Sequence, residues 1–332
     1  MNKKGITVAG NLIADVVYTI DAYPKKGNLT WMNNPVSHTG GINNLIIDLA
    51  RLDQKIPIKV SGIIGDDENG QLIVDTLKKY SNIDTQGVVK GERTAVTFAM
   101  TEKESKQRTF FFDPGTTLEY NESQIDYEKM KSEIFHLEYL LLLGTLDQPD
   151  QEYGTKAAKV LATAQKYGME TSIDMVSEES GRYQKIVWPA LKYTDYCVVN
   201  EVEGTGVTGI QLYDEHGIKE ENMRKGVEKL KELGVKKWAI IHSPMCGYGL
   251  DCQNGEFVKF PSFKLPKGFI KGTTGAGDAF CAGVLYAAYK KESIKKALYY
   301  GAVTAACSLS EEDSNSGVKN LEKMKFFMKK FV

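Results

Sequence analysis

The residues best suited to chemistry lie in one short segment near the C-terminus, GTTGAGDAF at 272–280. Gly275, Ala276 and Gly277 carry almost no side chain, so their backbone N–H groups can converge on an anion such as a phosphate. The apolar run that begins near Asp278 predicts a helix, whose N-terminus adds partial positive charge at the same place. The segment therefore predicts an anion-binding loop at the start of a late helix.

Asp278 is unexpected beside a loop that only holds phosphate, because a fixed carboxylate would repel that ligand. It is consistent with phosphoryl transfer, in which a carboxylate accepts the proton of the attacking alcohol while N–H groups stabilise the transferred phosphoryl. A structural explanation stays open, since glycines before a helix make tight turns and a first-turn acid stabilises the helix. The order GxxGxG matches neither the dinucleotide-binding GxGxxG loop nor the phosphate loop GxxxxGK followed by Ser or Thr.

The elements that must position this loop are short apolar runs that alternate with helical periodicity, a pattern typical of βαβ units around a parallel sheet. Strands are predicted at 6–10, 57–65, 137–144, 169–176, 195–200 and 236–243, and helices at 42–52, 70–80, 155–168 and 222–234. Gly168 and Gly234 are expected to end the last two helices. We therefore predict an α/β fold in which a doubly wound, mostly parallel sheet has helices on both faces, as one domain over residues 1–332.

Two segments, 16–39 and 93–112, break this pattern with alternating or β-branched runs joined by polar turns. They predict antiparallel strands that pair as a small β-sheet lid projecting from the main domain. Such a lid beside a site would exclude water on closure. Its exposed edge could also pair with a second copy, which makes a homodimer possible. The alternative, that these strands are edge hairpins of the main sheet, stays open.

The composition excludes several classes of partner. Lys and Arg number 42 against 43 Asp and Glu, so the net charge of −1 creates no field that would attract nucleic acid or a membrane surface. No apolar run approaches the ~20 residues that a bilayer-spanning helix needs. The five cysteines form no CxxC pair, which argues against a disulfide framework or a zinc site. We expect a cytoplasmic protein with a small-molecule partner, and neither a nucleic-acid nor a membrane partner.

Two separated segments resemble signatures of the ribokinase-like, or PfkB-type, carbohydrate kinase family. TTGAGDAFCAG at 273–283 resembles the family run DTxGAGDxFxxG, and GGINNLIIDLARL at 40–52 resembles its glycine pair followed by an asparagine and an amphipathic helix. The resemblance covers nearly the whole chain. It implies a ribokinase-like fold and an enzyme that uses ATP and Mg²⁺ to phosphorylate a hydroxymethyl group on a sugar or sugar-like molecule.

The resemblance also implies roles for residues of the two signatures. Asp278 corresponds to the catalytic base of the family, and Gly275, Ala276 and Gly277 correspond to its anion hole.

On the acceptor side, Asp15 resembles the acid that binds substrate hydroxyls, and Gly40, Gly41 and Asn44 would line the same pocket. A carboxylate and an amide suit a polyol, since the carboxylate accepts from two hydroxyls and the amide both donates and accepts.

The nucleotide side is implied by three further segments. Asn200 and Glu203 resemble the NxxE motif that helps to hold Mg²⁺ near the phosphates, commonly through water. Asn200 would also contact the nucleotide, together with Ser243, Gly247 and Thr274.

Three departures from the family pattern limit these assignments. Gly272 stands where many members have an aspartate, which leaves the ordering of the loop and any monovalent-cation dependence open. The spacing after Gly41 is one residue shorter than usual, so either Asn43 or Asn44 could face the acceptor. Ile13 replaces a polar residue of several sugar-specific members, so the resemblance does not imply ribose itself.

Other functions stay open on the sequence. A nucleoside kinase on the same fold would need the same residues, because a ribonucleoside presents the same hydroxymethyl group and vicinal diol. A sugar- or nucleotide-sensing protein without activity would explain Gly272, and an NAD-dependent oxidoreductase is a more distant alternative. The four histidines lack metal-ligand spacing, and Arg108 on the lid could reach a substrate or phosphate or simply be solvated.

Overall fold

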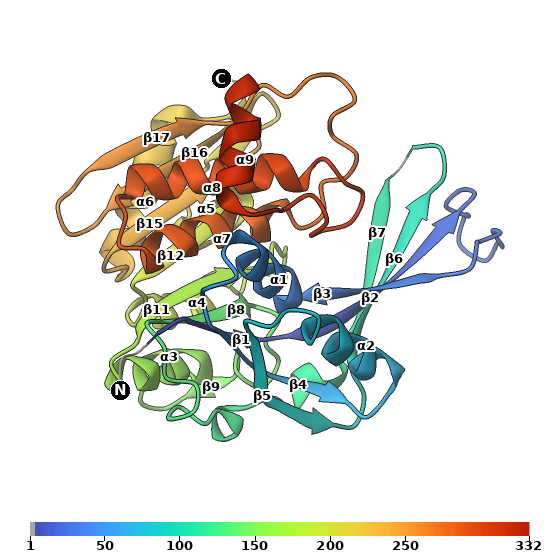
Figure 1. The fold of residues 1–332 in the computed structure, drawn as a ribbon, viewed down its shortest axis with the longest axis horizontal. Coiled ribbons are helices and arrows are strands. Elements are labelled where there is room, and N and C mark those ends of the chain that lie inside the picture. Colours follow the sequence, from blue (N-terminus) through green and yellow to red (C-terminus); the bar gives the residue numbers. More distant parts are fainter. Residues whose placement is uncertain (1–3, 106, 332) are drawn as a thin grey trace.

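The computed structural model describes residues 4–105 and 107–331. Its main sheet has nine strands in the order β17–β16–β15–β12–β11–β8–β1–β4–β5 (Figure 1). All neighbouring strands are parallel except in the pairs β15–β16 and β16–β17, so only β16 runs opposite to the others. The strands are β1 (Ile6–Gly10), β4 (Ile58–Gly65), β5 (Ile83–Gly91), β8 (Ile134–Leu140), β11 (Glu170–Met175), β12 (Tyr196–Asn200), β15 (Trp238–His242), β16 (Cys246–Asp251) and β17 (Phe257–Pro261).

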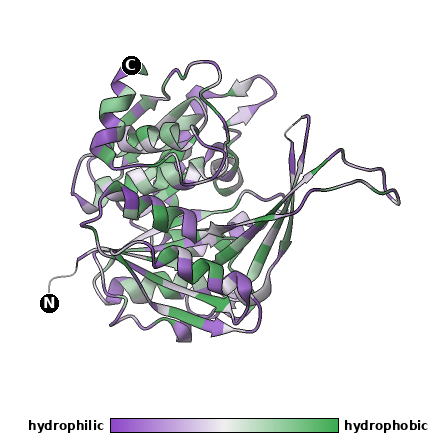
Figure 2. Ribbon diagram, turned by 45° about the vertical axis from the view of Figure 1, so that its right-hand side comes forward, coloured by the Kyte–Doolittle hydropathy of each residue, from purple (hydrophilic) through white to green (hydrophobic). Residues whose placement is uncertain are grey.

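Helices cover both faces of this sheet, as the sequence predicted. Alternate residues of a strand pack to opposite sides: in β15, Trp238 and Ile240 join one hydrophobic cluster, whereas Ala239 and Ile241 join the other. The first cluster includes α1 (Ile42–Leu52), α2 (Glu68–Leu77), α7 (Ala276–Tyr289), α8 (Ile294–Ser308) and α9 (Leu321–Met328). The second includes α3 (Lys156–Lys166), α4 (Tyr183–Leu191), α5 (Glu201–Thr208) and α6 (Glu220–Leu233). Figure 2 shows the apolar colour concentrated on the central strands and the helices packed against them.

The second sheet has four strands in the order β3–β2–β6–β7 and projects from one side of the molecule (Figure 1). Its strands are β2 (Leu12–Ile20), β3 (Val36–Gly41), β6 (Ala95–Glu102) and β7 (Arg108–Asp113). The predicted lid is therefore a separate sheet, and the alternative of edge hairpins in the main sheet is wrong. The pairs β2–β3 and β6–β7 are antiparallel as predicted, but the central pair β2–β6 is parallel.

The sequence located some element boundaries imprecisely. β2 begins at Leu12 and not at residue 16. Its first residues are mostly buried and follow β1 after a single residue, so the sequence shows no clear boundary between the two strands. β8 ends at Leu140, and the residues expected to extend it form a turn closed by the bond from Leu142 N–H to Tyr139 O. β5 was not predicted, because it is a half-exposed edge strand with many polar residues. Gly168 and Gly234, with φ of 76° and 130°, follow the ends of α3 and α6 as expected.

The remaining elements of the described chain are small. They comprise the strand pairs β9 (Pro149–Asp150) with β10 (Gly154–Thr155) and β13 (Tyr213–Asp214) with β14 (Gly217–Ile218), and the 3₁₀ turns η1 (Gly115–Leu118), η2 (Glu122–Gln124) and η3 (Lys329–Phe331). None of the helices in the part of the chain that the structure describes combines the length and the apolar character that crossing a bilayer requires.

Candidate functional site

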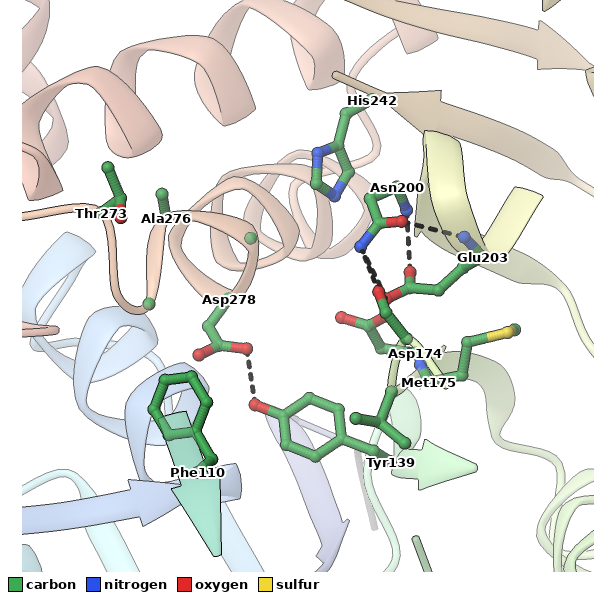
Figure 3. Close-up of a pocket in the computed structure, with 14 residues that line it drawn as sticks. Phe110, Tyr139, Asp174, Met175, Asn200, Glu203, His242, Thr273, Ala276 and Asp278 are labelled. Atoms are coloured by element: carbon green, nitrogen blue, oxygen red, sulfur yellow. Dashed lines mark hydrogen bonds between the residues drawn. The ribbon is translucent and has the colours of Figure 1, made fainter. Parts of the chain in front are cut away.

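A cavity of about 410 Å³ lies where the lid, the carboxyl ends of four parallel strands and the start of α7 meet (Figure 3). Tyr139, Asp174, Asn200 and His242 lie at or next to the ends of β8, β11, β12 and β15. Phe110 enters the cavity from lid strand β7. The crevice outside the carboxyl ends of parallel strands is where open α/β sheets bind ligands.

The start of α7 forms one wall of the cavity, and the helix begins at Ala276, two residues earlier than predicted. Gly275 caps it in the left-handed region with φ 77°, and an added Cβ there would lie 2.6 Å from the Ser314 Cβ. Across the described residues, no acceptor is hydrogen-bonded to the N–H groups of Gly277 or Asp278. Two first-turn donors are therefore free beside the cavity, as an anion site at a helix N-terminus requires.

Asp278 lies at the centre of the site, and both of its carboxylate oxygens accept a hydrogen bond. The Tyr139 hydroxyl donates to Oδ1 at 2.6 Å, and the Asn44 side-chain amide donates to Oδ2 at 3.0 Å. Burial raises the pKa of Asp278 to about 6, while these two donors oppose the rise. A carboxylate with this pKa is mostly ionised at pH 7 and is a stronger base than an ordinary aspartate.

The lid strands bring the predicted acceptor-binding residues to the same region. Asp15 of β2 pairs in register with His38 of β3, and an added Cβ on Gly40 would lie 2.3 Å from the Asp15 Oδ2. Only a glycine at position 40 therefore leaves room for the Asp15 carboxylate. Gly41 has φ 60°, and a Cβ there would meet the Asn11 carbonyl at 2.3 Å. Burial and the nearby charge of Asp278 raise the pKa of Asp15 to about 6, whereas a bond from Thr97 lowers it.

The two asparagines at the start of α1 point in different directions. The Asn43 amide donates to the carbonyls of Gly40 at 2.6 Å and Ile13 at 3.3 Å, so this side chain joins β2, β3 and α1. Asn44 instead reaches Asp278. Of the two, Asn44 is the one that faces the site, and its nearest polar partner is the predicted base.

The NxxE residues form a capping box at the start of α5. Asn200 Oδ1 accepts from the N–H groups of Val202 and Glu203, and Glu203 Oε2 accepts from the Asn200 N–H. Glu203 Oε1 accepts from the Ser177 hydroxyl at 2.8 Å. Burial raises the pKa of Glu203 to about 7. Both carboxylate oxygens thus already have protein partners, so a cation held through water suits this donor set better than direct ligation.

The predicted nucleotide residues separate into two groups. Thr274 lies in the loop before α7, where its hydroxyl accepts a hydrogen bond from Arg108 of the lid. The Ser243 hydroxyl donates to the Cys246 carbonyl within the turn between β15 and β16. A Cβ on Gly247 would lie 3.1 Å from the Phe280 ring. Thr274, Ser243 and Gly247 are not among the residues that line the cavity, so their contact with a nucleotide stays a prediction.

The departure at Gly272 has a steric explanation. An added Cβ would lie 2.8 Å from the Glu312 carbonyl oxygen and 2.9 Å from that of Glu311. The segment 311–312 therefore leaves no room for an aspartate at this position.

Several residues of the site were missed or set aside at the sequence level. Glu138, Asp174 and Asp278 bring three carboxylate oxygens within 4.8 Å of one another. Glu138 is fully buried and is bonded at 2.8 Å to His136, whose pKa burial lowers to about 3. The signal that could have found Glu138 and Asp174 is their position at the ends of predicted parallel strands.

His242 and Tyr139 were also missed as residues of the cavity. The His242 ring stacks on Phe280 with 4.7 Å between centroids, and burial lowers its pKa to about 4. It lies across from α7, with Cε1 3.8 Å from a Cβ built on Gly277. Tyr139 sits inside an apolar run, EYLLLLG, in which nothing marks it as a polar group of a site.

The chain is similar to known proteins over most of its length. Residues 3–321 match the model of the pfkB family carbohydrate kinases. The chain is 24% identical to ribokinase of Haemophilus influenzae over 95% of both chains, and 26% identical to probable fructokinase-7 of Arabidopsis thaliana over 80% of this chain and 75% of that protein. It is also 24% identical to 5-dehydro-2-deoxygluconokinase of Lacticaseibacillus casei over 88% of this chain and 86% of that protein.

Solved structures show the same fold. Thermotoga maritima ribokinase superposes with a TM-score of 0.79 at 22% identity, covering 98% of this chain and 99% of that one. Arabidopsis thaliana ribokinase, solved with ribose and ATP, gives a TM-score of 0.79 at 19% identity, with 99% of each chain covered. The protein therefore belongs to the pfkB family of carbohydrate kinases and is an ATP-dependent carbohydrate kinase.

Proposed function

We propose that the protein transfers the γ-phosphoryl group of ATP to a hydroxymethyl group of a sugar or sugar-like acceptor, with Asp278 as the general base. One observation carries this proposal: the Asp278 carboxylate and the free N–H groups that begin α7 line the same cavity. Phosphoryl transfer needs a proton acceptor for the alcohol and fixed donors for the charge that develops on the phosphoryl group. Both lie within one helical turn here.

In this reaction the acceptor hydroxyl oxygen attacks the γ-phosphorus as its proton passes to Asp278, and ADP leaves. The backbone N–H groups at 275–277, which form the proposed anion hole, would hold the phosphoryl oxygens together with the Asp278 N–H. Asp15 and Asn44, beside the close backbone of Gly40 and Gly41, would orient the acceptor, since a carboxylate accepts from two sugar hydroxyls.

The nucleotide phosphates would lie between α7 and the start of α5. Asn200 and Glu203 would hold Mg²⁺ through water molecules. Their side chains already form the cap of α5, and a hydrated cation could bind to them without breaking the hydrogen bonds of that cap. The bound cation would neutralise charge on the phosphates. Thr274 would contact the nucleotide from the loop before α7, next to the lid residue Arg108.

The lid would exclude water from the transfer. Phe110 lines the cavity, and Arg108 from the same strand bonds to Thr274, so the lid already meets the phosphate-side loop in this structure. Exclusion of water protects ATP from hydrolysis and strengthens the electrostatic interactions of the site.

A nucleoside acceptor is the second candidate, and one observation favours it. A second cavity of about 390 Å³ is lined by apolar side chains that include Phe112, and also by the polar or charged Thr117, Asp147, Gln148, Arg182 and Lys185. Phe112 follows Phe110 by two residues on β7, so both rings lie on the same face of the lid. This space, with apolar walls and several polar or charged groups, could receive a base attached to the sugar.

Large apolar side chains on the lid also support a homodimer. Leu29 and Trp31 are 80% and 78% exposed, and Phe111 is 55% exposed. A second copy that covered these side chains would remove an exposed apolar patch from water.

A coupled assay of ADP release tests the function with ATP, Mg²⁺ and a panel of hexoses, pentoses, sugar acids and nucleosides. We expect turnover with at least one polyol and no turnover without Mg²⁺. The absence of turnover with the whole panel would favour a protein that binds such ligands without phosphorylating them.

A further inference from the structure

Tyr139, which was not predicted as a site residue, forms a hydrogen bond with Asp278. Tyr139 lies near the end of β8, and its hydroxyl is 2.6 Å from Asp278 Oδ1 and 3.5 Å from the Gly41 carbonyl oxygen. Figure 3 shows the tyrosine reaching across the cavity from the strand end to the carboxylate. The hydroxyl therefore lies between the predicted base and the predicted acceptor pocket.

The groups around Asp278 are mostly acidic, so the neutral hydroxyl of Tyr139 is one of the few groups that can stabilise its ionised form. The titratable groups that interact electrostatically with Asp278 are Asp15 of β2, Asp48 of α1, Glu138 and Tyr139 of β8, Asp174 of β11, Glu203 of α5 and Cys281 of α7. His242 of β15 lines the same cavity. In the described structure, no lysine or arginine side chain forms a hydrogen bond or an ion pair with Asp278.

Among residues 4–105 and 107–331, therefore, two side chains donate hydrogen bonds to the carboxylate and stabilise its ionised form: the hydroxyl of Tyr139 and the amide of Asn44. Neighbouring acids and burial both favour the protonated form instead. The tyrosine is a permanent donor, because burial and the surrounding acids raise its pKa well above the usual value of 10.0. It keeps its proton at any pH at which the enzyme would work.

We propose that Tyr139 is a positioning residue: its hydroxyl fixes the Asp278 carboxylate and keeps it available as proton acceptor for the transferred alcohol proton. The inference rests on the proposed function, since it assigns a partner to the proposed base. Tyr139 does not itself take the proton, and the acceptor hydroxyl must approach one of the remaining lone pairs of Asp278.

Tyr139→Phe tests the proposal, because it removes the hydroxyl and keeps the ring. The wild-type pH profile of kcat/KM should fall below pH 6, where Asp278 gains its proton. In the variant the pKa of Asp278 should be higher, because the lost hydrogen bond to the carboxylate had lowered it. As the pH falls, Asp278 should therefore become protonated at a higher pH than in wild type. We expect the acid limb to move up by roughly one to two pH units, the usual effect of one such bond. This corresponds to a roughly 10- to 100-fold loss of kcat/KM at pH 5.5, with recovery above pH 8.

Tyr120→Phe is the matched control. Tyr120 is also buried, at 1% exposure, and its hydroxyl is 2.8 Å from the Ser61 hydroxyl, away from the cavity. Removing this hydroxyl should leave the pH profile of kcat/KM unchanged. A Tyr139→Phe profile that keeps its midpoint, whether the rate is unchanged or lower by one factor at every pH, would overturn the inference.

A second measurement does not depend on finding the acceptor. The carboxyl carbons of ¹³C-labelled aspartates can be titrated by NMR, and the Asp278 signal identified by its absence from Asp278→Asn. A titration midpoint of Asp278 that rises in Tyr139→Phe but not in Tyr120→Phe supports the inference, whether or not an acceptor is phosphorylated. Failure to phosphorylate any acceptor would reject the proposed function and leave this inference standing. An unchanged midpoint would reject the inference, whatever the activity.

Discussion

Asp278→Asn should inactivate the enzyme while making the folded protein more stable. The substitution keeps the shape of the side chain but removes its ability to accept a proton. Loss of a general base costs about 10²–10⁴-fold in rate, so we expect kcat to fall by that factor. ATP binding should persist, because the backbone N–H groups of α7 do not depend on the carboxylate.

The gain in stability follows from the raised pKa of Asp278. Burial moves this pKa from 3.8 to about 6, so the native state binds more protons than the unfolded state between these two values. The contribution of Asp278 to the free energy of unfolding therefore falls as pH rises from about 4 to about 6. A shift of roughly two pKa units corresponds to about 3 kcal/mol of destabilisation above pH 6.

Asparagine removes this cost but faces the Asn44 amide with a second amide, which offsets part of the gain. We expect Asp278→Asn to unfold with a free energy about 1–3 kcal/mol higher than that of wild type at pH 8, and with little difference at pH 4.

Urea denaturation at pH 4, 6 and 8 measures the stability, and the coupled ADP assay measures the turnover. Two results would contradict the reasoning separately. Full turnover by Asp278→Asn would remove Asp278 as the base. Equal stability of the two proteins at pH 8 would show that the carboxylate is not held in a desolvated, acidic environment.

Three further predictions concern the lid. Gly40→Ala should raise the KM for the acceptor at least tenfold and leave the KM for ATP within about twofold, because its Cβ would lie 2.3 Å from the Asp15 carboxylate. Steady-state kinetics measure both constants, and an equal change in the two would contradict this prediction. Arg108→Gln should weaken the contact between lid and loop at Thr274, and we expect faster proteolysis of the lid together with a lower kcat; a protected lid would show that this contact does not hold it. Trp31→Glu should turn a dimer into a monomer in light scattering, because it places a charge in the exposed apolar surface; a wild-type protein that is already monomeric would remove the proposed interface.

The parallel core could be predicted because its strands are continuous apolar runs separated by amphipathic helices. The glycines that follow α3 and α6 could be located from the sequence for a different reason. A helix often ends in a residue with φ above 0°, and glycine is the residue that adopts this conformation most readily. Edge elements were harder to predict. β5 is half exposed, and its sequence IDTQGVVKG lacks the alternation that marks a strand.

Residues of separate sequence motifs lie near one another in the structure. Gly40 is packed against the Asp15 carboxylate, and Asp15 interacts electrostatically with Asp278, while the roles assigned to these residues stay predictions. Tyr139 could not be found, since its partner is 139 residues away and only the tertiary structure joins them. Ser243 and Gly247 also fit a family pattern; in the structure Ser243 bonds within the turn between β15 and β16 and Gly247 lies next to Phe280, and their contact with a nucleotide stays a prediction.

The connection between the two sheets is short. Asn11 alone separates β1 of the main sheet from β2 of the lid, and its side chain is tied at 2.7 Å to the Leu142 carbonyl. Asp15 therefore belongs to the projecting sheet, whereas Asp278 belongs to a core helix. A tilt of the projecting sheet about this connection would change the separation of the two aspartates. If Asp15 binds the acceptor and Asp278 is the base, as proposed, the position of the lid would set both acceptor binding and its alignment with the base.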